Sequence, residues 1–350
     1  MNTLVGLLAF AICAAPIPKV VKPPEPTKEQ LKHAEKKISE LGGWCHFIPV
    51  SNDELAANHF ILQKQVTPEV LEKLDFLTFR CSLQLHDSCG ITDDTLAEIV
   101  RRVPYIDRLE LHSPHITSKG LEELPKLGRL KSLQIQCPKI DDDAMNSIAK
   151  LENLEFLSLE ECPITDVGIK LIASNTRLTS LRLKDVDFTG GHLQVLKKLP
   201  LEWLVVENIS YANDLLPILL EIKSLKSLVI SGSSLDDEGA RQLGKLKSLV
   251  LLSLDESSVT DEGVKALVEL EELTELSLFG MNVSDASATI LAQMKKLASL
   301  NLNGTDFTDS GLGKLAESKS LQHISVGSTQ VTNEAVAAFK KKKPDVSVER

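Results

Sequence analysis

Aromatic side chains are scarce in this 350-residue chain, where Phe, Trp and Tyr make up 4% of the residues although hydrophobic residues make up 43%. A core built from this composition must be almost entirely aliphatic. Basic residues are also in the minority, since 39 Lys and Arg stand against 49 Asp and Glu and the formal net charge is −10. Nucleic-acid binding requires a basic stripe, so the charge balance argues against such a partner.

The sequence motifs of common enzymes are missing as well. The chain has no GxSxG, P-loop, HExxH or dinucleotide fingerprint. His112 and His115 lack partner Cys or carboxylate residues, so they are interpreted as surface histidines rather than metal ligands. The acidic runs 141–143 and 236–238 are explained more simply as helix caps than as cation sites. We therefore predict a protein that is not an enzyme and has neither a cofactor nor a metal.

The apolar amino-terminal segment is too short to span a bilayer, and no stable membrane span is predicted. We interpret residues 1–15 as a secretory signal peptide and residues 16–27 as a proline-rich tether. Export to the periplasm, the cell surface or the extracellular space is therefore expected. The exact cleavage site is left open, and lipidation at Cys13, a retained anchor or a spurious start are the alternatives.

Five cysteines follow the signal segment, and this odd number leaves at least one thiol unpaired. Cys81 with Cys89 is the favoured disulfide in an oxidising compartment, with Cys45 as the other candidate partner. Cys162 is interpreted as a small apolar filler of the core. Cys137 lies one place earlier in its own segment and is expected to face elsewhere, which argues against a bridge to Cys162.

What the sequence has in abundance is a repeat. The segment 154–178, LEFLSLEECPITDVGIKLIASNTRL, has the alternating leucines of a half-buried strand, then a turn, then apolar residues at a helical spacing. Its LxxLxL signature recurs every 24 residues, with one interval of 23. The signature begins at Ile106, Leu130, Leu154, Leu178, Leu201, Leu225, Leu249, Leu273, Leu297 and Leu321. A unit of this size cannot close a core alone, so stacked units are predicted.

The repeat LxxLxLxxxx(I/V/F)TDxGLxxLxxL resembles the leucine-rich repeat family, and more closely the variety found in secreted proteins of planctomycete-type bacteria. The resemblance covers about residues 58–340. It implies an α/β fold, a horseshoe-shaped solenoid with a parallel concave sheet and short helices on the convex side. The Asn ladder of many family members is absent, so packing is expected to hold the inner turns of the first half. The unit that begins at Leu201 is the sixth when the irregular unit before Ile106 is counted. It lacks the TDxG turn and contains Pro217, and its return segment is expected to be irregular.

Two end segments are expected to cap the solenoid of residues 58–340, because a terminal rung would otherwise expose its leucines. Residues 28–57 begin with an amphipathic pattern that ends at Gly42, which predicts a helix. The aromatic side chains expected to cover the first rung are Trp44, Phe47 and Phe60. In residues 341–350, Val346 and Val348 are expected to add a short edge strand.

The third, fifth and seventh residues of each LxxLxLx signature are expected to point off the concave surface, because the leucines take the opposite side of the pleat. An apolar centre ringed by charge falls on neighbouring units there, and this is the composition of a binding hot spot. The residues predicted to contact a partner are Phe156, Arg182, Trp203, Val205, Val229, Leu251 and Phe279. The alternative is that the sixth unit or a flanking loop covers Trp203.

These observations predict a non-catalytic scaffold that binds a protein or peptide partner on its concave face. A structural component of an envelope or surface layer, without a defined ligand, is one alternative. An intracellular adaptor resembling the cysteine-containing repeats of ubiquitin-ligase substrate receptors is another, although the chain has no recognisable F-box. The sequence identifies neither the ligand nor the oligomeric state, because the inner-face residues vary independently of the fold.

Overall fold

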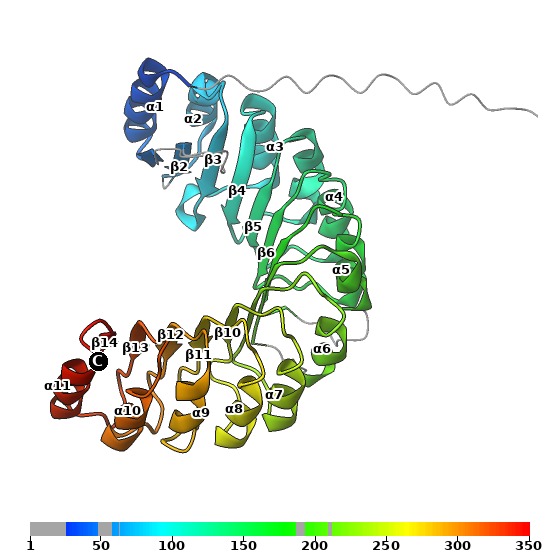
Figure 1. Ribbon diagram of the computed structural model, residues 1–350. Helices are drawn as coiled ribbons and strands as arrows, with labels where there is room; N and C mark the ends of the chain where they lie inside the picture. The colour runs from blue at the N-terminus through cyan, green and yellow to red at the C-terminus, as the bar shows by residue number, and fades with distance from the viewer. Residues whose placement is uncertain (1–25, 48–57, 63, 187–192, 209–211) are drawn as a thin grey trace, which may run out of the picture.

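The structure, a computed structural model, describes residues 26–47, 58–62, 64–186, 193–208 and 212–350. Its strands form one 14-stranded sheet along the inside of an arc, and its helices follow the outside of the arc (Figure 1). The strands lie in chain order from one end of the sheet to the other. The predicted solenoid, with a concave sheet and helices on the convex side, is therefore confirmed.

The strands of the sheet are short, with at most seven residues each. They are β1 Trp44–Phe47, β2 Asn58–Leu62, β3 Cys81–Leu85, β4 Ile106–His112, β5 Ser132–Gln136, β6 Phe156–Glu160, β7 Ser180–Lys184, β8 Trp203–Glu207, β9 Ser227–Ser231, β10 Leu251–Ser253, β11 Glu275–Ser277, β12 Ser299–Asn301, β13 His323–Ser325 and β14 Ser347–Glu349. β1 pairs with β2 in the antiparallel sense, and every later pair is parallel.

The return segments are α-helices or 3-10 helices, the latter labelled η. They are α1 Lys28–Glu40, α2 Pro68–Glu72, η1 Lys73–Phe76, η2 Asp87–Cys89, α3 Asp93–Arg102, η3 Ser118–Lys126, η4 Asp142–Ala144, α4 Met145–Ile148, α5 Asp166–Ile172, η5 Leu193–Lys198, α6 Ala212–Leu219, α7 Asp237–Leu243, α8 Asp261–Leu267, α9 Ala288–Gln293, α10 Asp309–Leu315 and α11 Asn333–Lys342. None of the helices within the described ranges is long and apolar enough to cross a membrane.

The core is an aliphatic ladder between the sheet and the helices. Each central strand directs two consecutive inward side chains into it, such as Leu157 and Leu159 of β6 or Leu228 and Ile230 of β9, all fully buried. Stacking of the units makes these pairs continuous from rung to rung. Burial of an aliphatic side chain is worth about 1.5–3 kcal/mol, so the ladder is the main source of stability.

The amino-terminal helix forms as predicted. Thr27 caps α1 in a reciprocal capping box with Gln30, Ala34 and Ile38 are fully buried, and Gly42 ends the helix at a φ of 73°. The expectation that Trp44 covers the first rung is wrong, because its side chain is 61% exposed. Alternate residues of a strand face opposite sides, and Cys45, rather than its neighbour Trp44, packs against the core.

Phe60 is fully buried, as expected. The side chain of Phe47 and the whole of residues 48–57 lie outside the described part of the chain, as do the predicted signal peptide and most of the predicted tether. The domain boundaries drawn from the sequence there stay predictions.

The return segment of the sixth unit differs from its prediction. Residues 212–219 form the helix α6 although Pro217 lies inside it. The helix persists because Leu215, Leu216 and Leu219 are buried, and their packing outweighs the hydrogen bond that the proline cannot donate. Residues 209–211 lie outside the described part of the chain.

A ladder of side chains joins consecutive turns on the convex side. In each case one carboxylate oxygen accepts from the backbone N–H of a Thr or Ser in the next unit, and the other oxygen accepts from its hydroxyl. The pairs are Asp93 with Thr117, Asp142 with Thr165, Asp237 with Thr260, Asp261 with Ser284, Asp285 with Thr308 and Asp309 with Thr332. The TD sequence of the repeat therefore bonds between units as well as capping its own helix.

The helix glycine of the repeat belongs to the same arrangement. In the unit that begins at Leu249, the Gly263 amide also donates to Asp237 Oδ1 at 3.0 Å. A Cβ added to Gly263 would lie 2.6 Å from that oxygen. Glycine is therefore required at this position because the carboxylate of the preceding unit occupies the space of a side chain.

At the carboxyl-terminal end, β14 pairs in parallel with β13, so the predicted last edge strand is confirmed. Arg350 then donates from Nε to the Val331 carbonyl at 2.7 Å and from Nη1 to Asn333 Oδ1 at 2.7 Å. Asn333 stands where the ladder has Asp in the earlier units, and Arg350 supplies the donor that a following Thr supplies elsewhere.

Candidate functional site

Three parallel rows of side chains cross the strands on the concave face. The row at the N-terminal ends of the strands alternates small and large residues over seven rungs. Its members are Ser82, Arg108, Ser132, Phe156, Ser180, Trp203 and Ser227, followed by Leu251. Side chains on the inside of a curved sheet converge, so the serines leave room for the large residues between them. This alternation is visible in the sequence once the register is known.

Phe156 and Trp203 meet above the rung that lies between them. Both are in register with Ser180 of β7, and their ring centroids are 5.9 Å apart with the planes inclined at 33°. Both residues are half-buried. An aromatic pair in this geometry is worth about 0.5–1.5 kcal/mol beyond its buried area. The pair is therefore fixed in position while part of each residue remains accessible on the concave face.

The other apolar residues predicted for the site continue this surface unevenly. Val229 and Leu251 are half-buried, on the two strands that follow Trp203. Phe279 is 40% exposed, just beyond the C-terminal end of β11. Val205 is only 5% exposed, so it contributes little accessible area. The structure thus brings Phe156, Trp203, Val229 and Leu251 onto four of the five neighbouring strands β6 to β10, while Phe279 lies further along the arc.

Arg182 lies at the centre of this surface and is held by two carboxylates. Its Nη1 is 3.3 Å from Glu160 Oε1, and its Nη2 is 2.7 Å from Glu207 Oε2. Glu160 is buried and also accepts from the Ser158 hydroxyl at 3.1 Å. The guanidinium is therefore fixed between two carboxylates on the neighbouring strands β6 and β8. The sequence analysis assigned Arg182 to the site but did not assign Glu160.

A shallow hollow lies on the same face next to Leu251, with a volume of about 230 Å³. Its lining is Leu251, Leu252, Ser253, Asp255, Glu275, Leu276, Ser277, Ser299 and Asn301. Asp255 Oδ1 accepts from the Ser277 hydroxyl at 2.5 Å and from the Phe279 amide at 2.9 Å. The hollow adds polar groups beside the apolar surface. Ser253, Ser277 and Asn301, at the fifth position of their LxxLxLx signatures, are the sequence feature that indicates it.

The predicted alternative is that the sixth unit or a flanking loop covers Trp203. The helix α6 of that unit lies on the convex side of the arc, away from the concave face (Figure 1). The ring that contacts Trp203 belongs to Phe156. The flanking segments 187–192 and 209–211 lie outside the described part of the chain.

The residues considered as metal ligands do not form a cluster. Within the described part of the chain, no group of three or more His, Cys, Asp or Glu residues is arranged to hold a metal ion. His115 is exposed, whereas His112 is half-buried, stacks on His86 and contacts Gln136 through Nδ1 at 3.0 Å. Asp141 and Asp236 accept bonds from the first amides of their helices, as predicted.

Two predictions about cysteine are wrong. All five cysteines of the described residues are free; Cys81 is the first residue of β3 and Cys89 lies beyond the other end of this strand, too far away to be bridged. Cys137 and Cys162 do occupy equivalent places, since their thiols contact Leu111 O and Ile135 O, which belong to paired residues of β4 and β5. Glu161, which precedes Cys162, has a left-handed φ of 52°.

Burial makes these thiols poor nucleophiles. It raises the pKa of Cys137 to about 12 and that of Cys162 to about 11, and it also raises the pKa of Cys81. A thiol that stays protonated neither attacks a substrate nor binds a metal at neutral pH. The interpretation of Cys162 as an apolar filler agrees with this environment.

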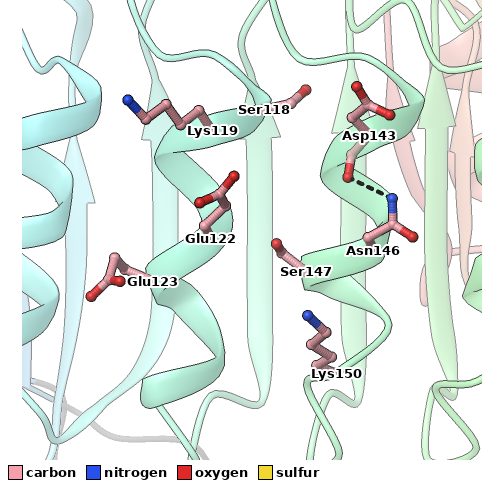
Figure 2. Close-up of a pocket in the computed structure, with 8 residues that line it drawn as sticks. All are labelled: Ser118, Lys119, Glu122, Glu123, Asp143, Asn146, Ser147 and Lys150. Carbon is pink, nitrogen blue, oxygen red and sulfur yellow. Dashed lines mark hydrogen bonds between the residues drawn. The ribbon is translucent and has the colours of Figure 1, made fainter.

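A hollow between two helical segments has a different character. It is about 580 Å³ in volume and lies between η3 and the η4–α4 segment (Figure 2). Its lining is Ser118, Lys119, Glu122, Glu123, Asp143, Asn146, Ser147 and Lys150. Figure 2 shows these polar side chains along the two helical segments, with Asn146 bonded to the Asp143 carbonyl at 3.2 Å. It offers no apolar anchor, so the concave surface is the better candidate.

The comparisons with known proteins agree with this fold. Residues 150–173 and 293–316 match the family model described as Leucine Rich repeat. No curated protein gives a significant match. The chain is similar to the structure of an internalin from Listeria monocytogenes, with 18% identity and a TM-score of 0.44 over 74% of this chain and 88% of that one.

It is also similar to the structure of an LRR protein from Leptospira interrogans, with 15% identity and a TM-score of 0.33 over 82% of this chain and 93% of that one. Neither similarity carries information about a ligand, and the finer resemblance to the planctomycete-type variety stays a prediction. The 24-residue repeat, the concave sheet in chain order and the two matched segments together identify leucine-rich repeats in this chain.

Proposed function

We propose that this leucine-rich repeat protein is a non-catalytic scaffold that binds a protein or peptide partner on its concave face. The observation that carries the proposal is the half-exposed pair of Phe156 and Trp203 in the middle of the sheet. Binding energy at protein interfaces is concentrated in aromatic and Arg residues that are already held in place. Here two aromatic residues and Arg182 meet on three neighbouring strands.

The surroundings of the pair support recognition more than catalysis. Val229 and Leu251 extend the apolar surface, and Glu160, Arg182 and Glu207 form a bonded charge group beside it. The buried thiols have raised pKa values, and no cluster suited to a metal occurs in the described ranges. A surface of this kind can orient a partner, but it offers no activated nucleophile.

The test is crosslinked affinity capture from the source cells with three forms of the protein. The parent is compared with the Trp203→Ser, Leu251→Ser double variant and with Val167→Ser as a matched control. Val167 lies on α5 and is 61% exposed, so its replacement removes apolar surface away from the concave face. A partner held by the parent and the control, and lost by the double variant, is the expected result.

A structural role in an envelope or surface layer is the second candidate, and β14 provides an observation in its favour. This strand closes the sheet, and within the described residues it is paired only with β13. A strand with one unpaired edge can template association between chains. If the parent and the double variant capture only further copies of themselves, the structural role replaces the recognition role.

We also propose that the protein is exported, with residues 1–15 as the signal peptide. The support is the apolar run and the proline-rich tether that follows it. Fractionation of the source cells, with amino-terminal sequencing of the recovered chain, tests this proposal. A full-length chain in the cytoplasm would favour the intracellular adaptor instead.

A further inference from the structure

We infer that the partner segment is an extended cationic stretch, in which Lys or Arg residues alternate with apolar residues. This inference rests on the proposed function and deepens it by naming the chemistry of the ligand. It comes from the distribution of charge on the two sides of the aromatic pair, which differ sharply.

The side at the C-terminal ends of the strands is acidic. Six acidic residues lie along it from β6 to the turn after β10, namely Glu160, Glu161, Asp185, Glu207, Asp255 and Glu256. The basic residues among them are Arg182 and Lys184, and Arg182 is already bound to Glu160 and Glu207. An excess of negative charge therefore faces any ligand on this side.

Three of these acids form an exposed rim along the turns. Glu161, Asp185 and Glu256 are exposed, and their backbones have φ values of 52°, 51° and 56°. Glu161 accepts a bond from the Gln136 amide at 2.9 Å, and Asp185 accepts one from the Asn208 amide at 2.8 Å. These donors are neutral, and within the described residues none of the three acids forms an ion pair. Their charge is therefore available to a cationic ligand.

The opposite side, at the N-terminal ends of the strands, is electrically balanced. Glu155 is paired with Lys131 at 2.8 Å, and Glu202 is paired with Lys226 at 3.0 Å. Val250, which directly precedes β10 as Glu202 and Lys226 precede β8 and β9, is 37% exposed. A ligand therefore meets apolar and neutral groups on one side of the face and acids on the other.

The dimensions of the face fit an extended segment that crosses the strands. Phe156 and Leu251 are four rungs apart, which is about 19 Å and matches the length of about six extended residues. Trp203 and Glu207 lie four residues apart along β8, a separation of about 13 Å. The middle of the three rows of side chains lies between the rows of Trp203 and Glu207. From β6 to β9 its members are Ser158, Arg182, Val205 and Val229.

A segment lying along this middle row would direct alternate side chains to opposite sides. Apolar side chains would reach the row of Phe156, Trp203 and Leu251, and cationic side chains would reach the acidic rim. Neither half of this arrangement alone defines the ligand. Together they specify an amphipathic strand with positive charge on one edge.

The test uses three synthetic nine-residue peptides with an amino-terminal fluorophore, whose sequences alternate Lys with Leu, Glu with Leu, and Lys with Ser. Binding to the full chain is measured by fluorescence anisotropy at low salt. The Lys/Leu peptide is expected to bind at least tenfold more tightly than either of the others. Equal binding of all three peptides, or binding of none, would overturn the inference.

Two charge-reversal variants locate the effect. Glu161→Lys, Asp185→Lys, Glu256→Lys is expected to weaken binding of the Lys/Leu peptide at least tenfold. The matched control Glu122→Lys, Glu152→Lys, Glu317→Lys changes the net charge equally at exposed acids on η3 and in the turns after α4 and α10, outside the strands, and it should change binding less than threefold. Equal losses in both variants would show a nonspecific attraction and refute the inference.

The inference and the proposed function fail separately. If Trp203→Ser, Leu251→Ser abolishes capture of a cellular partner while the rim reversal leaves both capture and peptide binding unchanged, the scaffold role stands and the cationic ligand is wrong. If the peptide binds the parent and the Trp203→Ser, Leu251→Ser variant equally, the apolar row has no part in peptide binding and the inference is wrong. If the two forms also capture the same cellular partner equally, the proposed function is wrong.

Discussion

The rings of Phe156 and Trp203 face each other across the rung of Ser180, with their centroids 5.9 Å apart. Strand spacing alone would place side chains two rungs apart at about 9.6 Å, so the contact requires the two rings to approach each other over the small serine. The relationship links an ordinary feature of the repeat, a small third-position residue, to a partly accessible aromatic pair on the concave face.

The first prediction is an energetic coupling between these two rings. In a double-mutant cycle, Phe156→Ala and Trp203→Ala should show an interaction energy of about 0.5–1.5 kcal/mol, because each single change already removes the ring contact. Phe156→Ala with Leu251→Ala is the control, since these residues lie four rungs apart. The control should be additive within about 0.5 kcal/mol in urea unfolding.

The second prediction concerns the ladder between units. Asp237→Ala removes the acceptor for the Thr260 amide, the Thr260 hydroxyl and the Gly263 amide. Leaving these donors unpaired should lower the free energy of unfolding by about 1–3 kcal/mol. Asp306→Ala, at an exposed residue two positions before Thr308, should change it by less than about 0.5 kcal/mol. Equal effects would show that the ladder contributes nothing.

The third prediction concerns how the stability that Asp237 contributes depends on pH. Burial by itself would raise the pKa of Asp237, but the donors on Thr260 and Gly263 together lower it below its usual value. A lowered native pKa stabilises the fold above the unfolded value of about 3.9, and the contribution is lost as the pH falls through the native value. The parent should therefore lose more stability than Asp237→Asn between pH 6 and pH 2. Parallel curves for the two proteins would contradict this.

The fourth prediction concerns the left-handed turn residue that follows each strand from β6 to β13. Gly304 has a φ of 71°, and Glu256 occupies the equivalent place at 56°. Gly304→Ala should lower the free energy of unfolding by about 1–2 kcal/mol, although a Cβ there would meet no atom closer than 3.5 Å. Glu256→Gly should conversely be neutral or slightly stabilising. A neutral Gly304→Ala would mean that this turn can change its backbone conformation freely.

The repeat made most of the fold predictable. Its period gave the number and order of the regular rungs, and its leucines gave the buried side of each strand. The errors arose where neighbours decide the outcome. Trp44 was expected to be covered, but the alternation of β1 points Cys45 inward instead. Cys137 was placed wrongly because the next turn has the left-handed residue Glu161 before its cysteine, and counting along the sequence does not reveal this change of backbone conformation.

The candidate site was predictable as a set of positions but not as a set of contacts. Register placed Trp203, Arg182 and Leu251 on one face, since side-chain alternation is fixed by the pleat. The ring contact across Ser180 and the burial of Val205 depend on the curvature of the sheet, which the sequence does not state. The ladder of Asp237 and Thr260 was also missed, because the TD motif shows only the spacing within one unit.

The fifth prediction is that Arg182 is held by charge rather than by packing. Arg182→Leu would leave the buried Glu160 and the half-buried Glu207 without the guanidinium that lies between them. An unpaired charge of this kind should cost about 1–3 kcal/mol of unfolding free energy. Adding Glu160→Gln to Arg182→Leu removes one of the two stranded charges, so the double variant should be more stable than Arg182→Leu alone. If Glu160→Gln destabilises the parent and the Arg182→Leu background equally, the two side chains are not coupled. In that case the acidic excess around Trp203 would be larger than the bonded geometry indicates, because Arg182 would no longer offset Glu160.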